Sequence, residues 1–93
     1  MIRKPTKEEN GWKIWEIENS SRVTKIEFQL TRQKGAILRA GELILTFKTS
    51  GARYIYHNVP EVLVLNAVSA ESVGKGLNPI IHNKRIKYEK LEA

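Results

Sequence analysis

The sequence predicts an α+β domain, an antiparallel meander of three to four strands followed by two C-terminal helices packed on the sheet. Three observations predict this class. The chain has 93 residues, of which 41% are apolar and 28% are charged, which fits one compact domain. Apolar and polar residues alternate in its middle part, as they do in half-buried strands. After Asn58-Val59-Pro60 the apolar residues recur at helical spacing instead.

Four segments show the pattern of strands. In one of them, Val23–Thr31, the apolar Ile26, Phe28 and Leu30 fall on one side and polar residues on the other. Thr49-Ser50-Gly51 has the composition of a hairpin turn, with Gly51 at a positive φ. The polar stretch 31–35 is expected to be a connection that carries positive charge. The predicted strands are Trp12–Glu18, Val23–Thr31, Leu43–Lys48 and Arg53–His57.

Two helices are predicted after the strands. Asn58 is a suitable capping residue, Pro60 stands near the first helical position, and Glu61 places an acid in the first turn. We therefore expect a helix from Pro60 to about Ser72. Asn78-Pro79 has the form of a second helix start. The short terminal helix that would follow has an apolar stripe and many cations: Ile80, Ile81, Ile86 and Tyr88, with Lys84, Arg85, Lys87 and Lys90.

The domain organisation is expected to be simple. Residues 1–10 are predicted to form a flexible N-terminal arm, and residues 11–90 a single domain. The first residues are basic but lack the apolar stretch of a signal peptide, and no apolar run is long enough to span a bilayer. We therefore expect no membrane association and a cytoplasmic location.

Composition excludes several functional classes. The chain has no cysteine, which removes disulfides, thiol nucleophiles and thiolate zinc sites. Its ten acidic residues are all glutamates, so catalytic triads that end in Asp and calcium loops are absent as well. His57 and His82 have no second metal ligand at short spacing. We predict a protein that is not an enzyme and needs neither a metal nor a cofactor.

The excess of cations points to an anionic partner. Sixteen Lys and Arg residues against ten Glu give a formal charge of +6. Tyr54 and Tyr56 share one face of a predicted strand, where aromatic side chains can stack on successive bases, although two such tyrosines also suit a core. Arg53 and His57 point to the opposite face, which can hold a phosphate or can simply be solvated.

Two further basic regions are candidate anion sites. Ser72-Val73-Gly74-Lys75-Gly76 combines glycines, a hydroxyl and a lysine, and can either cradle a phosphate or only end the helix. We expect Lys75, His82 and Arg85 to be neighbours across this turn. The densest positive charge is His82, Lys84, Arg85 and Lys87, which can contact a polyanion or form a solvated helix face.

Trp12 and Trp15 suggest an interface. They lie on opposite faces of a short N-terminal edge strand, and a small domain cannot easily bury both sides of such a strand. We expect one of the two to be exposed or covered by another subunit. The alternative is that the N-terminal arm folds back over the sheet.

Several of these residues carry a family resemblance. Leu43-x-Leu45-x-Phe47, Gly51, Tyr54-x-Tyr56-x-x-Val59-Pro60, Ala67, Ser72-Val73-Gly74-Lys75, Asn78 and Ile81 resemble the KTSC domain, which is named for its place at the C-terminus of some lysyl-tRNA synthetases. The similarity covers about residues 21–88. It implies a short binding module for which RNA binding is the usual suggestion. Small versions of this module also occur in phage genomes, so a phage origin is expected.

Three functions follow as alternatives. The first is a nucleic-acid-binding module of the KTSC type, with RNA as partner. The second is an oligomeric phage-type protein that binds and sequesters a small anionic nucleotide-derived ligand, with Arg53, His57 and Lys75 in a pocket between subunits. The third is a protein-binding adaptor or inhibitor with a basic surface.

Overall fold

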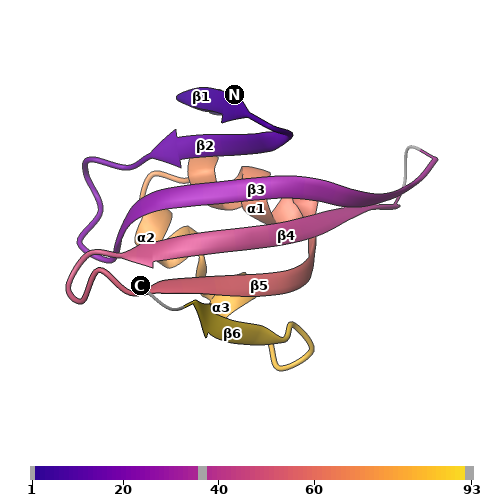
Figure 1. Cartoon of the computed structure of the whole chain (residues 1–93). Helices are drawn as coiled ribbons and strands as arrows, with labels where there is room; N and C mark the ends of the chain where they lie inside the picture. The colour runs from indigo at the N-terminus through magenta and orange to yellow at the C-terminus, as the bar shows by residue number, and fades with distance from the viewer. Residues whose placement is uncertain (1, 36–37, 92–93) are drawn as a thin grey trace.

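The structure, a computed structural model, describes residues 2–35 and 38–91. The strands form one antiparallel sheet in the order β1-β2-β3-β4-β5-β6, and the helices lie together on one face of it (Figure 1). The strands are β1 (Lys7–Glu9), β2 (Trp12–Glu16), β3 (Val23–Lys34), β4 (Leu38–Phe47), β5 (Arg53–Pro60) and β6 (Tyr88–Leu91); the helices are α1 (Glu61–Ser69), α2 (Val73–Gly76) and α3 (Asn78–Ile81).

The core lies between the sheet and the helices. The alternation in β3 and β4 turns Ile26, Phe28, Leu43 and Leu45 toward the helices, and all four are buried. From the other side α1, α2 and α3 contribute buried residues: Val64, Ala67, Val68, Val73, Leu77 and Ile80. The helical layer therefore covers one face of the sheet, called the inner face below. The opposite face is called the outer face.

The predicted fold class is wrong. The described part of the chain forms six strands rather than three or four, and in place of the expected terminal helix it forms the short α3, a turn and β6. α3 has four residues, and the Asn83 side chain then accepts a hydrogen bond from the backbone N–H of Arg85 (2.9 Å), which favours a turn. Tyr88 pairs with Tyr56, so this segment satisfies backbone groups that β5 would otherwise expose at the sheet edge.

The first helix begins one residue later than predicted and is shorter. Pro60 is its N-cap, and no side chain caps it. Asn58 lies within β5 with a φ of 55°, so it does not serve as the expected cap. The turn at Gly51 is as expected, with a φ of 71°.

The N-terminal segment takes part in the sheet. β1 pairs with β2, and the backbone N–H of Arg3 donates to Ser69 Oγ on α1 (2.9 Å). Much of the segment expected to be a flexible arm is thus attached to the domain by hydrogen bonds, and β2 is not an edge strand. No helix in the described residues is long and apolar enough to cross a membrane.

Candidate functional site

Strand alternation divides the predicted site residues between the two faces of the sheet. Tyr54 and Tyr56 pair with Leu45 and Leu43 and lie on the inner face. Arg53 and His57 lie on the outer face. Lys75 belongs to α2, on the inner side. One subunit therefore does not bring Arg53, His57 and Lys75 into a common pocket.

A cleft of about 810 Å³ opens on the inner side, between the helical layer and the β5–β6 end of the sheet. Such a volume is typical of ligand sites in proteins. The cleft has an aromatic part and a polar part. Its lining residues are Phe47, Tyr54, Tyr56, Tyr88 and Ile81, together with Ser21, Arg22, Thr49, Ser50, Ser72, Gly74 and Lys75.

The aromatic part is a continuous cluster. Phe47 meets Tyr54 edge to face with ring centroids 5.6 Å apart, and Tyr56 stacks on Tyr88 at 5.4 Å. Tyr56 is buried, and this burial is the main cause of the raised pKa of its hydroxyl. Tyr88, in contrast, is 59% exposed. The cluster therefore has a fixed base in β5 and an open aromatic surface on β6.

The polar part contains two cations with different roles. The Arg22 guanidinium donates to the Gly74 carbonyl (2.9 Å) and to Asn78 Oδ1 (2.7 Å), so it fixes α2 and α3 against the start of β3. Lys75 is exposed, and its backbone N–H donates to Ser72 Oγ (3.4 Å). Because Lys75 is an exposed residue of the cleft lining whereas the Arg22 guanidinium already has two partners, Lys75 is the better placed of the two to meet an incoming anion.

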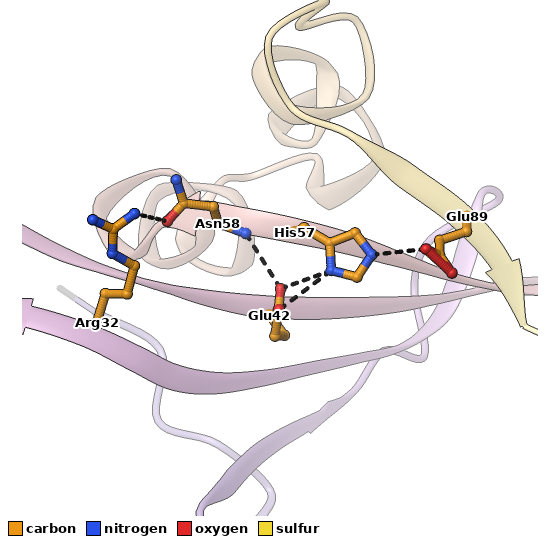
Figure 2. Close-up of polar contacts among 5 residues, drawn as sticks. All are labelled: Arg32, Glu42, His57, Asn58 and Glu89. Atoms are coloured by element: carbon orange, nitrogen blue, oxygen red, sulfur yellow. Dashed lines mark hydrogen bonds and ion pairs between the residues drawn. The ribbon is translucent and has the colours of Figure 1, made fainter.

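On the outer face, the predicted cations have carboxylate partners. Arg53 forms an ion pair with Glu27 (3.2 Å). His57 lies between two glutamates: Nδ1 is 3.2 Å from Glu42 and Nε2 is 3.3 Å from Glu89 (Figure 2). The hydrogen bond to Glu42 is the main cause of the raised pKa of His57. These two cations are thus paired within the sheet.

The cations predicted for a terminal helix lie elsewhere. His82 follows α3 directly, and Lys84, Arg85 and Lys87 occupy the turn that leads into β6; all four are exposed. The backbone N–H of His57 donates to the Lys87 carbonyl (2.9 Å), which fixes the end of this turn to β5. The turn, called the basic turn below, leads directly to Tyr88 in the cleft.

The two tryptophans do not form an exposed edge. Trp15 is buried on the inner face, and its indole N–H donates to the Arg3 carbonyl (3.1 Å). Trp12 lies on the outer face and is partly buried. The N-terminal segment contacts this strand and α1, since β1 pairs with β2 and Arg3 bonds Trp15 and Ser69. A role of Trp12 or Trp15 in an interface stays a prediction.

Sequence reasoning missed several residues of the cleft as site residues, among them Tyr88, Phe47 and Arg22. The apolar pattern assigns Tyr88 to the stripe of a helix, and Phe47 is named only as part of the family resemblance. Arg22 has no sequence signal, because its role depends on Gly74 and Asn78, far away in the chain. The one available signal was the alternation of Tyr88 with Lys87 and Glu89, which suits a strand as well as a helix end.

The cleft can stack on a planar ring and neutralise a negative charge nearby. Among the described residues no group of three or more His, Cys, Asp or Glu side chains could hold a metal ion. Comparison of the chain with family models, curated proteins and solved structures finds no significant match. The resemblance to the KTSC domain therefore stays a prediction.

Proposed function

We propose that this protein is a non-enzymatic nucleic-acid-binding module of the KTSC type and that its partner is single-stranded RNA. The observation that carries the proposal is the cleft, where the exposed ring of Tyr88 lies beside Tyr54 and Tyr56 with Lys75 at the rim. Unpaired bases stack on aromatic side chains, and phosphates pair with cations. Both kinds of group meet at this one place.

The basic turn extends the proposed surface. Lys84, Arg85 and Lys87 immediately precede Tyr88 in the chain, and β6 then runs along β5 past Tyr54. An RNA strand that places a base against Tyr88 would have its neighbouring phosphates near these cations. The net charge of +6 adds a long-range attraction.

The proposal is tested by anisotropy titration of labelled single-stranded RNA at several salt concentrations. Tyr88→Ala should weaken binding about 5- to 150-fold, because base stacking on one aromatic side chain contributes about 1–3 kcal/mol. Lys75→Gln should lower the slope of log K against log salt by about 0.7, the value for one phosphate of a single strand. Lys25→Gln removes the same charge from the outer face and is the matched control. Equal binding by all variants would refute the cleft as the site.

A second candidate is a small nucleotide-derived ligand, and the volume of the cleft favours it. In that case a mononucleotide should saturate the cleft and displace RNA completely. Native mass spectrometry of freshly purified protein would then show an added mass of nucleotide size, and Tyr88→Ala would remove it. Displacement only by oligonucleotides would favour the RNA module.

A further inference from the structure

The β3–β4 hairpin extends beyond the rest of the sheet as a two-stranded ribbon (Figure 1). The last pair between β2 and β3 is Trp12 with Gln29, and the last pair between β4 and β5 is Ala40 with Pro60. Beyond these pairs, among the residues that the structure describes, the pairs Gln33–Arg39 and Lys34–Leu38 have no further neighbouring strand in the sheet. We call residues 31–35 and 38–39 the ribbon arm.

Three structural features fix the base of the ribbon arm. The register of β3 and β4 shifts between Leu30 and Arg32, which marks a bulge, and bulges bend and twist a strand. At the same level Gly41 approaches β3 so closely that a Cβ on it would lie 1.9 Å from the Gln29 carbonyl oxygen. On the inner side, Arg39 forms an ion pair with Glu61, which is buried at the start of α1. The direction of the arm is thereby fixed relative to the domain.

The outer side of the ribbon arm is cationic. Arg32 and Lys34 are two residues apart on β3 and therefore share a side. The Arg32 guanidinium contacts Asn58 Oδ1 (3.4 Å), a neutral group that leaves its charge uncompensated (Figure 2). No ion pair to Lys34 is found within residues 2–35 and 38–91, and both cations are exposed. Leu38, paired with Lys34, is 45% exposed.

We propose that the ribbon arm binds the major groove of double-stranded DNA, with Arg32 and Lys34 contacting phosphates along the groove. That groove is about 12 Å wide and admits a two-stranded ribbon. The two residue pairs beyond Ala40 extend about 7 Å, which covers most of the groove depth of about 8.5 Å. Leu38 supplies an apolar contact for thymine methyl groups. The deep, narrow major groove of RNA duplexes does not admit such an element.

This inference goes beyond the proposed RNA site and does not depend on it. The ribbon arm and the cleft involve different residues. Exposed charges on a ribbon can also serve only to prevent pairing with another chain, but charges of either sign do that. Binding to phosphates requires positive charge. Reversal of the charges therefore distinguishes the two roles.

The test is titration of a 16-base-pair DNA duplex by the full chain at several salt concentrations. Arg32→Gln/Lys34→Gln should lower the slope of log K against log salt by about 2, since each phosphate contact in B-form DNA contributes about 0.9. Arg32→Glu/Lys34→Glu should abolish measurable binding. Lys4→Gln/Lys25→Gln removes the same net charge outside the ribbon arm and is the matched control. It should lower the slope by less than half of the decrease expected for Arg32→Gln/Lys34→Gln. Circular dichroism establishes that each variant is folded.

Three results would overturn the proposal: an unchanged slope in Arg32→Gln/Lys34→Gln, equal binding of an RNA duplex of the same length, or a change in oligomeric state without a change in DNA affinity. The last would identify the ribbon arm as a contact with a second copy. The proposed RNA site in the cleft is tested separately, because Tyr88→Ala is expected to weaken the binding of single-stranded RNA and not the binding of the DNA duplex.

Discussion

The position of His57 between Glu42 and Glu89 predicts a stability that depends on pH. The perturbation is His57→Gln, which keeps a polar side chain but removes the charge. Protonated His57 is attracted to carboxylates 3.2 and 3.3 Å away. Because its side chain is 37% exposed, water screens both pairs, and we expect about 0.5–1 kcal/mol in total. For a domain of this size that corresponds to about 2–8 °C in Tm.

The direction follows from the raised pKa of His57, caused first by its hydrogen bond to Glu42. A raised pKa in the folded state gives stability that is fully present below the unfolded pKa of about 6.5 and is lost as pH rises through the folded value. The unchanged protein should therefore be more stable than His57→Gln at pH 5.5. The difference in unfolding free energy should vanish at high pH, where His57 is neutral.

The assay is urea denaturation of both proteins at pH 5.5 and pH 9. His82→Gln is the matched control, because His82 is exposed and has no ion pair within the described residues. It should follow the pH dependence of the unchanged protein. The reasoning is refuted if His57→Gln shows the same change in unfolding free energy between the two pH values as the protein itself.

Three further predictions concern the framework. Gly41→Ala should destabilise the fold by at least about 1–3 kcal/mol in urea denaturation, because its Cβ would meet the Gln29 backbone. Glu61→Gln should remove stability that the Arg39 pair provides above about pH 4.5 and that is lost on acidification, since this pair lowers the pKa of Glu61; the two proteins should converge in acid denaturation. Trp15→Phe should remove the solvent-shielded component in acrylamide quenching of tryptophan fluorescence, because Trp15 is 1% exposed.

The sequence predicts the middle of the fold well. Ile26, Phe28 and Leu30 alternate in β3 and Leu43 and Leu45 in β4, as expected for strands with one face on a core. Here the local pattern and the tertiary environment agree. The helix after Pro60 is predicted for the same reason, although the residue at its N-cap is Pro60 and not the predicted Asn58.

The ends of the fold were less predictable because their structure depends on pairing. Lys7–Glu9 is polar throughout and has no strand pattern of its own, yet it pairs with β2. Tyr88–Leu91 is mostly exposed, and its apolar residues suit a helix as well as a strand. In both cases the deciding interaction is the backbone edge of a neighbouring strand, which side-chain periodicity does not report.

The candidate site was predicted only in part for a related reason. Alternation along β5 correctly separates the tyrosines from Arg53 and His57, but it does not say which cations already have partners. Glu27, Glu42 and Glu89 come from three other strands, and only the sheet order brings them to β5. A basic sequence motif therefore overstates the number of cations free to bind an anion.

Neighbouring residues of β6 make contacts on the two opposite faces of the sheet. Tyr88 points to the cleft, whereas its neighbour Glu89 points to the outer face and contacts His57 at 3.3 Å. In the sheet formed by the described residues β6 is an edge strand, so one side of its backbone has no partner strand there. The contact between Glu89 and His57 adds to the hydrogen bonds that fix β6 to β5. The contact between His57 and Glu89 on the outer face thus supports the position of Tyr88, the exposed aromatic ring of the cleft. Sequence reasoning places His57 in an anion site. In the structure His57 instead contacts β6, the strand that carries Tyr88 into the cleft.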